Sequence, residues 1–138
     1  MSFFDGGELL IVKTYGDITK DELVSFNKDI YSGLKTIYPK LIIADHRDAN
    51  ILFSDEDLKE VIQVRLKFPG QKEVTLIFLV SGITDTTYAY LTNNVHLDNA
   101  INNRIFNTIK GCAEYLNFKF TYEQLLHMIE NLKYEYNH

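Results

Sequence analysis

The sequence has a single cysteine, two prolines and no tryptophan, and it contains no long charged or apolar runs. With Cys112 alone, an intramolecular disulfide is impossible. No apolar stretch approaches the roughly 20 residues that a membrane-spanning helix needs. The first residues have neither the basic region nor the long apolar region of a signal peptide. These absences predict a cytoplasmic protein that does not insert into a membrane.

Basic side chains are also in the minority. The chain of 138 residues has 14 Lys and Arg against 19 Asp and Glu, which gives a net charge of −5 at pH 7. Such a balance gives no electrostatic reason to bind nucleic acid or an anionic membrane, so neither is expected as a partner. The length suits one domain, and a hydrophobic fraction of 46% is ordinary for a globular protein.

Two apolar segments define the expected sheet. Residues 41–44 are too few for a helix, follow Pro39 and end abruptly in titratable residues, as a buried strand does when it leaves a sheet. Residues 74–80 show no alternation of polar and apolar side chains, which predicts a central strand covered on both faces. We expect these strands to be parallel neighbours. Residues 45–48 would then form a loop at the carboxyl edge of the sheet, where α/β proteins bind ligands and partners.

Helix starts separate the predicted strands. Thr19 with Glu22, and Thr121 with Gln124, have the spacing of a capping box. The predicted N-caps are Thr19, Ser54, Thr84 or Asp85, Thr108 and Thr121. Further strands are predicted at residues 8–15 and 104–106, and Asp5-Gly6-Gly7 is the turn signal of an N-terminal hairpin. Together these signals predict an α/β fold. Its mostly parallel sheet of about four or five strands would carry helices on its faces, an antiparallel hairpin strand at the N-terminus and an extra C-terminal helix.

The order of these elements resembles the STAS-like superfamily of bacterial anti-sigma-factor antagonists and their uncharacterised relatives. The residues that carry the resemblance are Gly16 and Thr19, the Asp-x-Arg strand end at 45–47, the cap Ser54, the apolar strand 74–80, Ile105 and Phe106, and the segment 113–116. The resemblance covers about residues 1–117. Residues 121–134 are expected to form a helical extension of the same single domain.

The resemblance implies a small cytosolic module that binds a partner protein. In the best-known branch of the superfamily, binding is controlled by phosphorylation of a Ser or Thr at the start of the second helix, and Ser54 is the matching position. This chain departs from that branch, because Phe53 precedes Ser54 and three carboxylates follow it at residues 55–57. Like charges so close oppose a dianionic phosphate. We interpret Ser54 first as a helix cap and second as a phosphosite.

Other candidate chemistry is sparse. Asp45, His46, Arg47 and Asp48 together have the groups for a metal site, a proton relay or an anion site. In an extended segment, however, Asp45 and Arg47 point to one face and His46 and Asp48 to the other, so we do not expect them to converge. No HExxH, GxSxG, GxGxxG or P-loop pattern occurs, and Cys112 is interpreted as a buried small hydrophobe. No metal, cofactor or catalytic residue is therefore predicted.

The sequence thus predicts a noncatalytic protein-interaction or regulatory module. A carrier of a small apolar or lipid-like ligand is the first alternative, and an enzyme of unknown type is the second. With Leu132, Tyr134 and Tyr136 complete an apolar patch on the last helix, which we expect to pack on the protein's own body, with a homodimer as the alternative. The expected interaction rim consists of Asp45, His46, Arg47, Asp48, Ser54, Ser81, Thr84 and Asp85.

Overall fold

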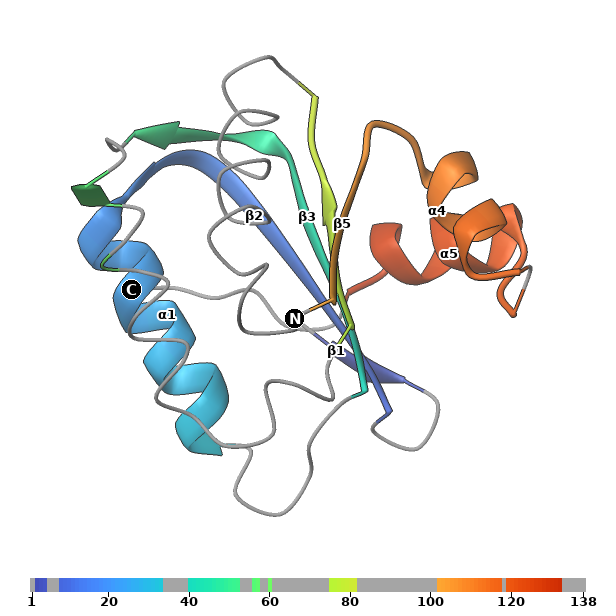
Figure 1. The fold of residues 1–138 in the computed structure, drawn as a ribbon, viewed down its shortest axis with the longest axis horizontal. Coiled ribbons are helices and arrows are strands. Elements are labelled where there is room, and N and C mark those ends of the chain that lie inside the picture. The colour runs from blue at the N-terminus through green and yellow to red at the C-terminus, as the bar shows by residue number, and fades with distance from the viewer. Residues whose placement is uncertain are drawn as a thin grey trace.

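The computed structural model describes residues 2–4, 8–33, 40–52, 56–57, 60, 75–81, 102–117 and 119–132. Five strands form one sheet in the order β1-β2-β3-β4-β5 (Figure 1). The strands are β1 (Ser2–Phe4), β2 (Leu9–Thr19), β3 (Leu41–Leu52), β4 (Thr75–Leu79) and β5 (Asn102–Phe106). The helices within the described residues are α1 (Lys20–Gly33), α4 (Ile109–Tyr115) and α5 (Tyr122–Glu130).

The predicted α/β fold with a parallel sheet is confirmed. Strands β2 to β5 are all parallel to their neighbours, and Ile43 of β3 lies opposite Ile77 of β4. Ile43 and Ile77 on one face are fully buried, and Ala44 and Phe78 on the other face are 7% and 4% exposed, as expected for strands covered on both faces. The short strand β1 pairs with β2 in the antiparallel direction. No hairpin is seen, because the predicted turn at residues 5–7 lies outside the described residues.

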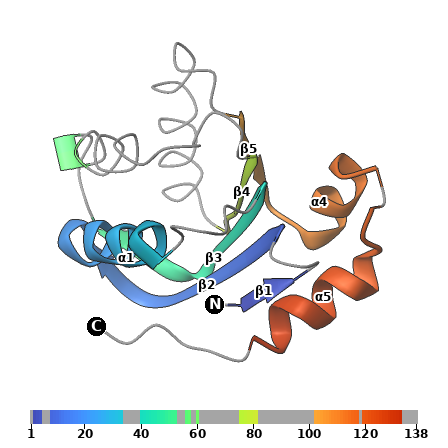
Figure 2. The ribbon, with the colours of Figure 1, turned by 90° about the horizontal axis from the view of Figure 1, so that it is seen from below.

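Helices cover the two faces of the sheet. Figure 2 shows α1 on one face and α4 with α5 on the other. The helix α1 lies in the connection between the parallel strands β2 and β3. The helices α4 and α5 follow the last strand and close the opposite face. No helix among the described residues is long and apolar enough to cross a membrane.

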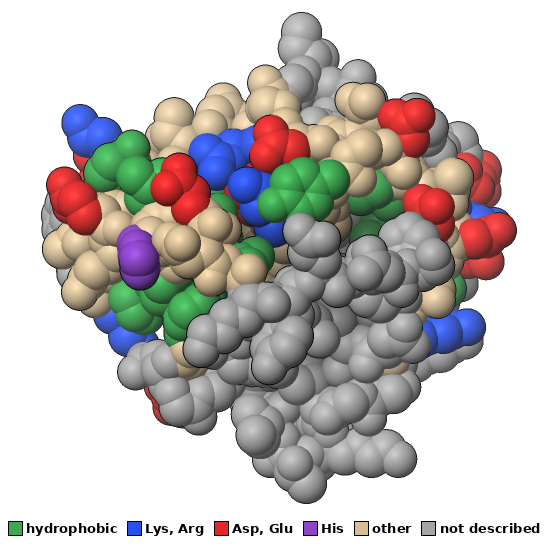
Figure 3. Space-filling view, turned by 180° about the vertical axis from the view of Figure 1, so that it is seen from behind, with side chains coloured by type: hydrophobic (Ala, Val, Ile, Leu, Met, Phe, Trp, Pro, Cys, Tyr) green, Lys and Arg blue, Asp and Glu red, His purple; other side chains and the backbone are tan. Residues whose placement is uncertain are grey.

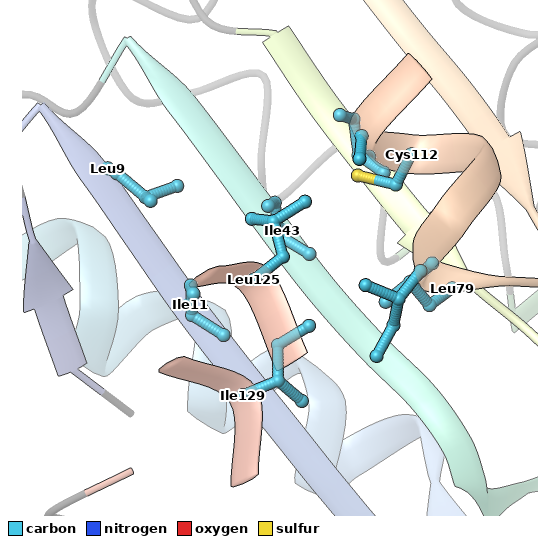
Figure 4. Close-up of a cluster of buried hydrophobic side chains, with 10 residues drawn as sticks. Leu9, Ile11, Ile43, Leu79, Cys112, Leu125 and Ile129 are labelled. Atoms are coloured by element: carbon cyan, nitrogen blue, oxygen red, sulfur yellow. The ribbon is translucent and has the colours of Figure 1, made fainter. Parts of the chain in front are cut away.

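The last helix is part of the main hydrophobic core. Leu125 and Ile129 of α5 lie against Ile11 and Ile43 of the sheet (Figure 4), and all four side chains are at most 2% exposed. The spacing of four residues places Leu125 and Ile129 on one side of the helix, which is why they reach the sheet together. Within the described residues, α5 therefore packs on the protein's own body. Tyr134 and Tyr136 lie outside the described residues.

Both predicted capping boxes are present. The Thr19 hydroxyl accepts a hydrogen bond from the Glu22 amide at 3.3 Å, and the Glu22 carboxylate accepts one from the Thr19 amide at 3.0 Å. The reciprocal bonds between Thr121 and Gln124 measure 3.1 and 2.9 Å. The predicted caps Ser54, Thr84 and Asp85 lie outside the described residues. Helix starts in this chain are thus set by local side-chain chemistry wherever the structure describes them.

The prediction of a loop at residues 45–48 is wrong. These residues lie inside β3, which is 12 residues long, and β2 likewise extends past Tyr15 to Thr19. The two strands continue to pair with each other after β4 has ended at Leu79. We call this extension, residues 15–19 and 48–52, the β2–β3 ribbon. Polar side chains are compatible with a strand here because one face of the ribbon is exposed.

We expect Leu125→Ala to lower the free energy of unfolding by about 2–5 kcal/mol, because it leaves a cavity between α5 and the sheet. Urea unfolding followed by circular dichroism measures this change. Lys110→Ala, at an exposed position of α4, is the control and should remain within about 0.5 kcal/mol of the wild type. Equal unfolding midpoints for the two variants would contradict the assignment of α5 to the core.

Candidate functional site

A buried ion pair lies where β3 passes the end of β4. The Arg47 guanidinium donates two hydrogen bonds to the Asp45 carboxylate, each 2.9 Å long, and the Arg47 amide donates a third at 3.1 Å. The Asp45 side chain is fully buried, whereas that of Arg47 is 29% exposed. The bonds to Asp45 raise the pKa of Arg47 above its usual value, and the charges of Asp48 and Glu130 add to this effect. The buried charge of Asp45 is thus compensated by Arg47, and its carboxylate oxygens accept hydrogen bonds within the protein.

His46 lies on the opposite face of the same strand. Its ring stacks on Phe78 of β4 with 5.9 Å between centroids, and Nδ1 is 2.7 Å from the Thr14 hydroxyl. That hydroxyl is also 3.4 Å from the Asp45 carbonyl. Since a hydroxyl has one hydrogen, both contacts are satisfied when His46 donates to Thr14 and Thr14 donates to Asp45. Burial lowers the pKa of His46 to about 4, despite the nearby charge of Asp45, so the ring is neutral at pH 7.

A β-bulge explains why Asp48 does not lie where simple alternation places it. Between the pairs Lys13–Asp45 and Tyr15–Asp48, β2 has one residue and β3 has two. The extra residue reverses the alternation, so Asp48 shares the face of Asp45 instead of that of His46. Its carboxylate lies 3.4 Å from the Lys13 ammonium. The prediction that His46 and Asp48 share a face is therefore wrong, whereas Asp45 and Arg47 do lie together.

The described part of the predicted rim has one further member. The Ser81 hydroxyl donates to the Arg47 carbonyl at 2.8 Å and so ties the end of β4 to the bulge. Ser54, Thr84 and Asp85 lie outside the described residues, so their places in the rim stay predictions. Sequence reasoning missed Thr14 and Phe78, because each meets His46 only through strand pairing.

Neither the described residues of the rim nor the cysteine forms a metal site or an activated nucleophile. Within the described ranges, no three His, Cys, Asp or Glu side chains are gathered closely enough to hold a metal ion. Cys112 is buried in α4, as predicted, and burial raises the pKa of its thiol to about 11. The thiolate is therefore scarce at neutral pH, and Cys112 packs as a small hydrophobe in the core with Ile109 and Ala113.

Comparisons with known proteins add no assignment to this geometry. No family model, no curated protein and no solved structure matches the chain.

Arg47→Ala should lower the free energy of unfolding by about 3 kcal/mol, because it leaves the Asp45 carboxylate buried without its counter-charge. The matched control is Asp48→Asn, which breaks the more exposed pair with Lys13 and should cost less than about 1 kcal/mol. Chemical unfolding at pH 7 measures both. Similar losses for the two variants would contradict the distinction between a buried and an exposed ion pair.

His46 makes stability depend on pH in a defined window. As the pH falls from 6.5 towards 4, the unfolded chain binds a proton at this position and the folded chain does not. The contribution of His46 to the free energy of unfolding is therefore fully present above about pH 6.5. It falls by about 1.4 kcal/mol per pH unit between the two pKa values, roughly 3 kcal/mol in all. Urea unfolding at several pH values measures the slope. His46→Gln should remove this loss, whereas His127→Gln, at an exposed histidine, should retain it.

Proposed function

We propose that this protein is a noncatalytic interaction module of the STAS-like type, which regulates a partner protein by binding it at the carboxyl end of its parallel sheet. The described elements β2, α1, β3, β4, β5 and α4 follow one another as the resemblance requires, whereas the Ser54 cap and the predicted third helix lie outside the described residues. The long neighbouring strands β2 and β3 give this end of the molecule a rigid base, which suits surface recognition.

The observation that carries the proposal is that the buried polar groups at this end, Asp45 and His46, already bond to other groups of the protein. The Asp45 carboxylate is hydrogen-bonded to Arg47. On the other face of the strand, His46 is neutral and contacts Thr14 and Phe78. An acid, a base and a nucleophile would have to approach one substrate atom, yet the backbone of β3 separates these groups. Asp17, Asp48 and Asn50 of the same end are exposed, as contact residues must be.

Sheet topology gives independent support. The parallel strands follow one another in sequence order, so the strand order does not reverse among the described strands. Open α/β sheets bind nucleotides and other small ligands in the crevice that such a reversal creates. Since the described strands show no reversal, the topology favours a surface rather than a crevice at the strand ends. A protein partner fits a surface of this kind.

The test is to isolate the full chain from its own host and to record native mass spectra. We expect a stoichiometric complex with a second protein, which is then rebuilt from the two purified components. The complex should form without turnover of added metabolites, because the polar groups are engaged within the fold. A small apolar molecule retained in place of a protein would contradict the proposal and favour a carrier. A chain that is isolated alone under every growth condition would contradict it as well.

A further inference from the structure

One face of the β2–β3 ribbon carries exposed side chains from both strands. Tyr15 on this face is 59% exposed, more than any other large hydrophobic side chain of the described residues. Beside it, the Asn50 amide donates to the Asp17 carboxylate at 3.1 Å, and both side chains are exposed. We call the surface formed by Tyr15, Asp17, Asp48 and Asn50 the Tyr15 face. Figure 3 shows acidic, basic and apolar side chains side by side on the described surface of one side of the molecule.

Charges near the Tyr15 face are arranged in two layers. The Lys13 side chain is only 15% exposed, lies 3.4 Å from the Asp48 carboxylate and has its ammonium 5.3 Å from the centre of the Tyr15 ring. The Arg47 guanidinium is engaged by Asp45. The Asp48 side chain, in contrast, is 58% exposed. Cations therefore lie beneath and carboxylates lie outermost, so an approaching molecule meets a negative surface around an aromatic ring.

We propose that the Tyr15 face binds a basic surface of the partner protein, with an arginine or lysine of the partner contacting the Tyr15 ring and pairing with Asp48 or Asp17. This inference rests on the proposed function and specifies the chemistry of the partner. A tyrosine contributes a large contact area at a small cost in conformational entropy, and cations are attracted to its ring. The surrounding carboxylates select against acidic partners and speed the approach of basic ones.

The same charges argue against the other occupants of this face. A second copy of the chain placed symmetrically would bring Asp17 and Asp48 of one copy near those of the other, and like charges repel. Nucleic acid and anionic membranes are repelled by the same carboxylates. The bulge in β3 is essential here, because it turns Asp48 towards Tyr15 instead of towards the α1 side.

The first test is photo-crosslinking in the host. The full chain carries p-benzoylphenylalanine in place of Tyr15 or, as a matched control, in place of Tyr122, an exposed tyrosine at the start of α5. We expect position 15 to crosslink to a partner peptide that contains arginine or lysine, and position 122 not to crosslink. A crosslink to an acidic peptide, to nucleic acid or to a second copy of the chain overturns the inference.

The second test measures affinity for the purified partner by calorimetry. Asp17→Asn combined with Asp48→Asn should weaken binding by about tenfold and reduce its salt dependence. Glu123→Gln, which removes an exposed charge from α5, should bind as the wild type does. Thermal unfolding checks that the variants fold.

A partner that crosslinks only from position 122, or that binds the double variant with unchanged affinity, overturns the inference and leaves the proposed function standing. A chain that crosslinks from neither position and forms no complex in native spectra overturns both.

Discussion

The buried pair of Asp45 and Arg47 is the constraint on which this end of the molecule depends. A carboxylate without solvent contact must be compensated within the fold, and Arg47 supplies two guanidinium bonds and one amide bond from only two residues away. The pair lies where β3 has one residue more than β2. We infer that the ion pair and the bulge support each other. Together they fix which side chains of the ribbon face solvent.

The two faces of β3 consequently have opposite electrostatic character. Asp45 carries a compensated charge on the side of α4 and α5, whereas His46 is neutral and stacked on Phe78 on the side of α1. Thr14 connects them, since its hydroxyl reaches both the imidazole and the Asp45 carbonyl. Polar residues that look like an active site in the sequence therefore bond to each other and to neighbouring strands within the fold. The proposed recognition surface consists of the exposed residues next to them.

Much of the fold follows from local signals in the sequence. Apolar segments identify β3 and β4 as buried parallel neighbours, and the capping boxes at Thr19 and Thr121 mark helix starts, because both signals depend on residues close in the chain. The length of β3 does not follow. Titratable residues at 45–48 resemble a loop, and only pairing with β2, about 30 residues away, makes them a strand. Simple alternation correctly places Asp45 and Arg47 on one face of the strand, but it places Asp48 on the wrong face. A bulge depends on contacts with the neighbouring strand, so the pattern of residues in the sequence does not reveal it.

The single extra residue of β3 has a consequence for how the chain tolerates change. The bulge places two neighbouring side chains, Arg47 and Asp48, on the same face of the strand, where the first pairs with Asp45 and the second with Lys13. Deleting one residue between Asp45 and Asp48 would restore simple alternation and leave Asp48 outward and Ala49, which is 4% exposed, inward. A single residue would then stand where the strand now has two. Natural variants that lose this residue are therefore expected to keep the facing of the ribbon and to lose either the partner of Asp45 or the imidazole on the opposite face.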